Sequence, residues 1–251
     1  MLELYHWEPT SNSGEPLILL HEKGVDFVSR YVDVLASEQH SPAFLKVNPQ
    51  AQVPVLVHDR KVVNETGFIL QYLEAVFHTP SFTPHDAHGR YWANVWIKYV
   101  NEYMAPAVWR LGMHKARAGQ GGAPGVASEG LARAPLERRQ AWAKATGEGW
   151  SSEELEITRA LLPTRIDHME ATLSAGDWLA GPDYSIADIV VFPTAAALPD
   201  LTPDLVNAAS TPRIIDWLER VRARPAVQQS LGLARSGVVQ FAPGPEGSRW
   251  G

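Results

Sequence analysis

Short apolar segments with alternating strand and helix periodicity fill the beginning of the chain. Residues 2–7 predict a strand, and the turn-rich residues 8–14 lead into a helix that Gly24 ends. Ser13 is a favourable N-cap for this helix, and Pro16 suits its first turn. The pattern therefore predicts a strand, a polar junction and then a helix.

The same alternation continues through the next five elements. Residues 27–34 are rich in β-forming side chains, Ser41-Pro42 begins a short helix, and residues 53–64 have the pattern of a hairpin. A further helix follows Glu65-Thr66, and its apolar side chains recur at helical spacing: Phe68, Ile69, Tyr72, Leu73 and Val76. The predicted order is strand, helix, strand, helix, two strands and helix.

Long helical patterns replace the strands after a Pro-rich connection. Helices are expected over residues 91–108, 137–144, 151–173, 186–197 and 211–223. Two of them begin with a capping box, formed by Ser151 with Glu154 and by Ser185 with Asp188. We therefore expect an α/β domain over residues 1–80 and an all-α domain over residues 87–251.

Two segments of the second part do not have the pattern of packed elements. Residues 117–133 are rich in Gly and Ala, and the tail from Pro243 is rich in Gly and Pro. We expect residues 117–133 to form a weakly structured excursion that partly covers an organic substrate, and the tail to be frayed.

Composition narrows the class of site. The 251 residues include 22 basic and 28 acidic side chains without a basic block, so a nucleic-acid partner is not expected. There is no cysteine, which excludes disulfides, cysteine metal sites and a cysteine nucleophile of the protein's own. The first residues lack a signal-peptide pattern, and the most apolar stretch, residues 186–198, is too short to span a bilayer. We expect no membrane association and a cytoplasmic location.

Gln52-Val53-Pro54 stands at the head of a predicted strand. A proline is accepted at the first residue of a strand because it cannot donate to the ladder. A cis Val53–Pro54 bond would direct the Val53 backbone N–H and C=O outward, where an extended peptide could pair with them. An ordinary trans proline at a strand end is the simpler alternative.

Glu65-Thr66 stands at a predicted helix start. A helix N-terminus offers free N–H groups and the positive end of the helix dipole to a carboxylate, and the Thr66 hydroxyl adds a donor. Glu65 could pair with an ammonium group, so the two residues suit the head of an α-amino acid. A plain N-cap with an acidic neighbour is the alternative.

Asn12-Ser13 lies at the first strand–helix junction. A thiol with a pKa near 8.5 is only slightly ionised at neutral pH. An amide, a hydroxyl and a helix N-terminus directed at the sulfur would favour the thiolate, whereas a simple cap is again the alternative. The junction contains no tyrosine, since Tyr5 lies within the strand.

The order of elements, the Val53-Pro54 step and the Glu65-Thr66 cap together resemble the glutathione transferase superfamily. Ser185-Ile186-Ala187-Asp188 resembles the capping box of that family's buried helix, so the resemblance covers nearly the whole chain. It implies a thioredoxin-like α/β domain, an all-helical domain, a substrate pocket between them, and a homodimer. It also implies that glutathione is the co-substrate.

Within the superfamily the chain resembles the bacterial β-etherases that act in lignin breakdown and aromatic catabolism. The similar pieces include Glu38-Gln39-His40-Ser41, residues 47–54 around Gln52-Val53-Pro54, residues 96–103 and residues 135–142. The resemblance implies that glutathione binds at Gln39, His40, Gln52, Val53, Pro54, Glu65 and Thr66, with Asn12 and Ser13 beside its sulfur. The implied reaction is attack by glutathione thiolate on the carbon of an aryl ether, with loss of phenolate.

Other chemistry remains open on the sequence. A dehalogenase, isomerase or peroxidase that uses glutathione, or a non-catalytic binding module, has the same features. His85 and His88 are expected to belong to a solvated loop rather than a metal site. The aromatic row Trp92, Trp96, Tyr99 and Tyr103 is expected to serve core or dimer packing more than a substrate wall.

Overall fold

A computed structural model describes residues 1–119, 136–147 and 149–235 of the chain. Its first part contains one four-stranded sheet in the order β2-β1-β3-β4. The strands are β1 (Leu2–His6), β2 (Val28–Tyr31), β3 (Val55–His58) and β4 (Lys61–Asn64). β1 is parallel to β2 and antiparallel to β3, and β3 is antiparallel to β4. The predicted order of elements is confirmed.

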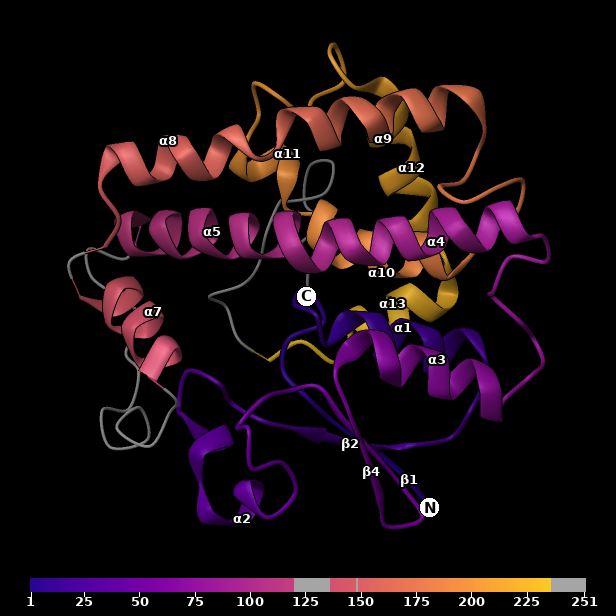
Figure 1. The fold of residues 1–251 in the computed structure, drawn as a ribbon, viewed down its shortest axis with the longest axis vertical. Coiled ribbons are helices and arrows are strands. Elements are labelled where there is room, and N and C mark those ends of the chain that lie inside the picture. Colours follow the sequence, from indigo (N-terminus) through magenta and orange to yellow (C-terminus); the bar gives the residue numbers. More distant parts are fainter. Residues whose placement is uncertain (120–135, 148, 236–251) are drawn as a thin grey trace.

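Helices cover the sheet on the side that faces the rest of the molecule. These are α1 (Gly14–Glu22) and α3 (Thr66–Val76), while η1 (Glu38–His40) and α2 (Pro42–Leu45) lie in the connection after β2. Figure 1 shows α1 and α3 between the sheet and the helical layers. Leu4, Leu17, Leu56 and Leu73 are fully buried between these elements because the strand and helix patterns present apolar side chains to each other.

The regular elements in the described residues of the second part are all helices. Its elements are α4 (Ala87–Tyr99), η2 (Val100–Met104), α5 (Ala105–Gly119), α7 (Leu136–Thr146), α8 (Ser152–Ala160), α9 (Pro163–Ala175), α10 (Ile186–Ala195), α11 (Leu198–Leu201), α12 (Pro212–Arg222) and α13 (Pro225–Leu231). None of the helices in the described ranges is long and apolar enough to cross a membrane. Helix α10 lies in the middle of the helical layers in Figure 1, and all of its side chains are buried.

Two sequence expectations about this part are corrected, and two more fall outside the part of the chain that the structure describes. Residues 151–173 form two helices rather than one, because Pro163 cannot continue the first helix and begins the second. The helix expected to end near residue 108 runs on to Gly119, so residues 117–119 are helical. Residues 120–133 of the expected cover, and the tail from Pro243, lie outside the described residues.

A one-turn π-helix, η2, joins α4 to α5. Ala105 N–H donates to the carbonyl of Val100, five residues earlier. Pro106 follows and has no N–H to donate, which favours a local change of helical register. The register change lies beside the cavity described below.

A buried ion pair connects α1, α3 and the segment that leads to α4. Lys23 Nζ lies 2.7 Å from Glu74 Oε1 and donates to the carbonyl oxygens of Phe77 and Pro80, each at 2.7 Å. Glu74 also accepts hydrogen bonds from the backbone N–H groups of Phe82 and Thr83. We call this set the linker clamp, because it fixes residues 77–83 against both helices.

Candidate active site

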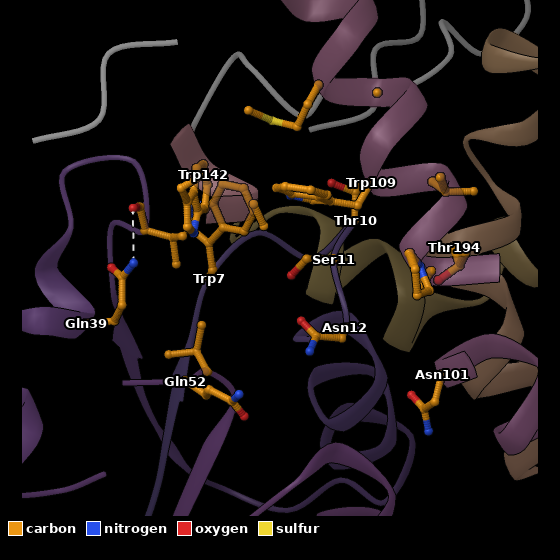
Figure 2. Close-up of a pocket in the computed structure, with 18 of the residues that line it drawn as sticks. Trp7, Thr10, Ser11, Asn12, Gln39, Gln52, Asn101, Trp109, Trp142 and Thr194 are labelled. Atoms are coloured by element: carbon orange, nitrogen blue, oxygen red, sulfur yellow. Dashed lines mark hydrogen bonds between the residues drawn. The ribbon is translucent and has the colours of Figure 1, made fainter. Parts of the chain in front are cut away.

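The described residues enclose a cavity of about 550 Å³ between the two parts of the chain. This volume is in the range of small-molecule sites. Trp7, Asn12 and Gln52 line it from the first part, and Trp109, Trp142 and Thr194 line it from the helices (Figure 2). This cavity agrees with the pocket between the two domains that the family resemblance implies.

The loop after β1 is shaped by its own hydrogen bonds. Ser11 donates its backbone N–H and its hydroxyl to the carbonyl of Glu8, at 2.9 and 2.6 Å. Ser13 N–H donates to Ser11 Oγ at 3.1 Å, and Ser13 Oγ accepts from Trp7 N–H at 3.0 Å. The two serine hydroxyls therefore hold the loop in its bend.

Ser13 and Asn12 have different positions in this loop. Ser13 is fully buried, is not among the residues that line the cavity, and makes no side-chain capping bond to α1. Asn12 is exposed, lines the cavity, and its amide makes no hydrogen bond within the described part of the chain. Of these two residues, Asn12 therefore presents the accessible polar group, and the Ser13 hydroxyl is buried.

Gln39, His40, Gln52 and Val53 line one end of the cavity. The Val53–Pro54 bond is cis, which confirms the prediction for this step. Asn48 Nδ2 donates to the carbonyl of Gln52 at 2.9 Å and fixes the segment before β3. Gln39 is buried, and its Oε1 has no hydrogen-bond partner among the described residues. A buried acceptor without a partner is costly, so this end of the cavity suits a ligand that donates a hydrogen bond.

Glu65 and Thr66 lie at the start of α3 and do not line the cavity as it stands. Glu65 is exposed and has φ 65° and ψ 122°, in the positive-φ region that non-glycine residues rarely adopt. Thr66 is buried, and the Glu65 side chain makes no capping bond. Such backbone strain concentrates at ligand-binding positions, and it leaves the first N–H groups of α3 available.

The two tyrosines near the junction make contacts away from the cavity. The ring of Tyr5 packs edge-on against Phe44, with centroids 5.9 Å apart. The Tyr31 hydroxyl donates to Glu8, and burial together with that carboxylate raises the pKa of Tyr31 well above its ordinary value. Neither phenol is therefore placed to stabilise a thiolate in the cavity.

His6 precedes the loop and supports it. Its Nδ1 donates to the carbonyl of Trp7 at 2.7 Å, and its Nε2 lies 2.7 Å from Ser29 Oγ. Burial lowers the pKa of His6 below its ordinary value. The neutral ring, which donates at one nitrogen and accepts at the other, satisfies both partners.

Tryptophans form the apolar wall of the cavity, and the sequence reasoning did not single them out. Trp7 and Trp142 belong to one buried cluster with Met113, and Trp109 packs edge-on against Trp142 with centroids 5.7 Å apart. Trp142 comes from α7 and is the last residue of the segment 135–142, which resembles the β-etherases. This wall suits an aromatic ligand, because aromatic side chains offer large apolar surfaces with specific ring geometry.

The other sequence candidates behave as packing or solvent-exposed groups. The four aromatic residues Trp92, Trp96, Tyr99 and Tyr103 lie outside the cavity lining, and Trp96 is fully buried. Within the described ranges, no group of three or more His, Asp or Glu side chains is arranged to hold a metal ion.

Comparison with known proteins places these features in a family. Residues 1–75 match the glutathione S-transferase N-terminal domain, and residues 146–225 match its C-terminal domain. The chain is 36% identical to Protein LigF of Sphingobium sp. over 237 residues, which cover 91% of this chain and 92% of that protein. It is 27% identical to the disulfide-bond oxidoreductase YfcG of Escherichia coli over 94% of this chain and 97% of that protein.

Solved structures show the same architecture. The crystal structure of β-etherase LigF from Sphingobium sp. superimposes with a TM-score of 0.83 at 34% identity, covering 92% of this chain and 98% of that chain. A glutathione transferase homologue from Sulfitobacter with bound glutathione has the same fold, with a TM-score of 0.65 at 22% identity over 91% of this chain and 96% of that chain. With its thioredoxin-like sheet domain and its all-α domain, the chain belongs to the glutathione S-transferase family.

Proposed function

We propose that this protein cleaves a β-aryl ether with glutathione. The thiolate attacks the carbon that bears the aryloxy group, the new S–C bond replaces the C–O bond, and phenolate leaves. The observation that carries the proposal is the cavity itself, which has a polar end at Gln39 and Gln52 and a tryptophan wall at Trp109 and Trp142. Similarity to β-etherase LigF over most of the chain supports the same reaction.

Glutathione lies in this proposal along the edge of the sheet. Glu65 and the start of α3 hold the γ-glutamyl end, because one acid and one helix N-terminus match its two charges. Val53, followed by cis Pro54, pairs its backbone with the cysteinyl residue. His40 and Gln52 lie at the glycyl end, and Gln39 accepts from the tripeptide. Thr66 donates from its hydroxyl or its backbone N–H to the γ-glutamyl carboxylate.

The sulfur lies beside Asn12 and the N-terminus of α1. The Asn12 amide is the side-chain donor, and the positive end of the α1 dipole adds to it. The Gly14 N–H already donates to the carbonyl of Ser11, and Pro16 has no N–H to offer. Ser13 contributes indirectly, because its hydroxyl accepts from Trp7 N–H and fixes the loop that carries Asn12. Asn12 thus contacts the sulfur and Ser13 supports the loop, whereas the sequence predicts the same role for both residues.

The remaining features of the proposal follow from the family. The chain forms a homodimer in the cytoplasm, with domains at residues 1–80 and 87–251. Phe68 on α3 and Tyr91 on α4 are largely exposed apolar side chains, and they suit burial against a second copy. The aromatic substrate places the protein in aromatic catabolism of the kind that degrades lignin.

Product analysis tests the reaction directly. The purified protein is incubated with glutathione and a mixed panel of β-aryl ethers and alkyl halides, and the products are identified by mass spectrometry. We expect a glutathione thioether together with an equal amount of free phenol from the aryl ethers. Turnover of the halides alone would assign the protein to a different glutathione-dependent reaction.

Glu65→Ala is expected to weaken glutathione binding about tenfold or more, because a charge-assisted hydrogen bond contributes about 1.5–3 kcal/mol. Isothermal titration calorimetry measures the dissociation constant. Glu156→Ala, an exposed acid on α8 outside the cavity, is the matched control and should leave it unchanged. An unchanged affinity in Glu65→Ala would place the γ-glutamyl group elsewhere.

Asn12→Ala is expected to raise the pKa of bound glutathione by about one unit, since one unit corresponds to about 1.4 kcal/mol of thiolate stabilisation. The absorbance of the bound thiolate against pH measures this shift, and Asn94→Ala on the exposed face of α4 serves as the control. Ser13→Ala should instead lower the stability of the fold, because Trp7 N–H loses its acceptor, and should move the thiol pKa less. If Ser13→Ala alone abolishes the pKa depression, the direct donor is Ser13.

A further inference from the structure

Thr194 presents a hydroxyl to the cavity from helix α10. The residue is 5% exposed and lines the cavity on the helical side. Its hydroxyl makes no hydrogen bond within the described residues. In Figure 2, Thr194 lies across the cavity from Gln39 and Gln52, on the same wall as Asn101. A polar group that is almost completely buried and still open to a cavity is available to a ligand.

The free hydroxyl distinguishes Thr194 from three other threonines that lie in helices of this chain or directly after one. The hydroxyls of Thr158, Thr172 and Thr202 each donate to the backbone carbonyl four residues earlier, at 2.7, 2.8 and 2.9 Å. This local bond is the usual way for a threonine in a helix to satisfy its donor. Thr194 does not use it, so its donor remains for a group inside the cavity.

The position of Thr194 relative to the sulfur follows from the packing of α10 on α1. A Cβ added to Gly14 would lie 3.1 Å from Pro193 Cγ and 1.9 Å from the carbonyl oxygen of Pro9. Only glycine fits there, and the start of α1 therefore lies directly against Pro193. Thr194 is the next residue, and it lines the helical wall of the cavity close to the start of α1.

We propose that the Thr194 hydroxyl donates a hydrogen bond to the ether oxygen that leaves as phenolate. This inference rests on the proposed function. In the displacement the thiolate forms the S–C bond while the C–O bond breaks, and the electron pair of that bond goes to the ether oxygen. The thiol proton has already been lost to solvent, and the released phenolate later takes its proton from solvent. A donor on the helical wall, across the cavity from Gln39 and Gln52, stabilises the charge that develops on the leaving oxygen.

The test uses Thr194→Val, which keeps the shape of the side chain and removes the hydroxyl. A series of aryl ethers whose phenols differ in pKa is turned over by the wild type and by the variant. We expect kcat/KM to fall about 10- to 100-fold for the least acidic phenol and much less for the most acidic one, because a poor leaving group depends more on the donor. Thr194→Ser should restore most of the loss.

Two further measurements separate this role from a structural one. Thr172→Val, which removes a hydroxyl that serves only its own helix, should leave the dependence on phenol pKa unchanged. The pKa of bound glutathione should be the same in Thr194→Val and the wild type. Thr194→Ala replaces the valine variant if that protein does not fold.

Each other outcome has a definite meaning. An equal loss for all leaving groups, or no loss, overturns the inference while the proposed function stands. A raised pKa of bound glutathione in Thr194→Val means that the hydroxyl contacts the sulfur, which also overturns it. A wild-type protein that releases phenol from none of the ethers overturns the proposed function, and the inference with it.

Discussion

Asp188→Ala is expected to lower the free energy of unfolding by about 4 kcal/mol or more, because three buried donors lose their acceptor at about 1–3 kcal/mol each. Asp188 Oδ1 accepts from Leu179 N–H at 3.1 Å and from Trp217 Nε1–H at 2.8 Å. Its Oδ2 accepts from the backbone N–H of Ser185 at 3.0 Å. The carboxylate is fully buried, so water cannot replace it for these donors.

The chain contains its own control for this prediction. Ser151 and Glu154 form a second capping box at the start of α8, with the same reciprocal bonds but on the surface. Ser151→Ala should cost only about 1 kcal/mol, the usual value of an exposed cap. Urea denaturation of both variants gives the comparison. Equal losses would mean that the Asp188 bonds to Leu179 and Trp217 contribute nothing beyond the cap.

Lys23→Met is expected to lower the free energy of unfolding by about 3–5 kcal/mol, because it leaves the Glu74 charge buried without its partner. The Lys23 side chain is fully buried, and that of Glu74 is 10% exposed. The variant should also loosen residues 77–83, since Phe77 and Pro80 lose the ammonium group that their carbonyl oxygens accept from. Hydrogen exchange of this segment measures the local effect.

A pH series distinguishes loss of the ion pair from loss of packing. Burial alone would raise the pKa of Glu74, but the hydrogen bond from Lys23 and those from Thr83 and Ser81 outweigh it and lower the pKa below its ordinary value of 4.5. A lowered pKa in the folded state means that the stabilisation is complete above pH 4.5 and declines as the pH falls. The difference between the wild type and Lys23→Met should therefore shrink in acid. The exposed pair of Lys98 and Glu102 is the control, and Lys98→Met should cost much less stability, because solvent screens this pair.

Features that depend on near neighbours in the sequence were predictable. Both capping boxes join residues three apart, so the spacing alone identifies them, and both sets of reciprocal bonds are present. The apolar pattern over residues 151–173 continues on both sides of Pro163 and therefore predicts a single helix. The structure has two helices instead, because proline has no N–H to continue the first helix.

The direction of the site side chains depends on contacts between distant residues. Ser13 and Asn12 are equivalent candidates in the sequence, and only the bond from Trp7 N–H to Ser13 Oγ turns one of them inward. Thr194 has no sequence signal at all, since its place in the cavity follows from the contact of Pro193 with Gly14, about 180 residues away in the chain. Trp142 likewise enters the cavity through the packing of α7.

Because residues of both domains line the cavity, ligand binding stabilises the contact between the domains, and that contact in turn strengthens ligand binding. An organic substrate that contacts Trp7 on one side and Trp109 on the other gains its binding free energy only while the two domains stay together. A ligand that contacts both walls therefore stabilises the association of the two domains, together with the linker clamp and the packing of α1 on α10. The substrate thus acts as a transient crosslink between the domains, and departure of the thioether product removes it.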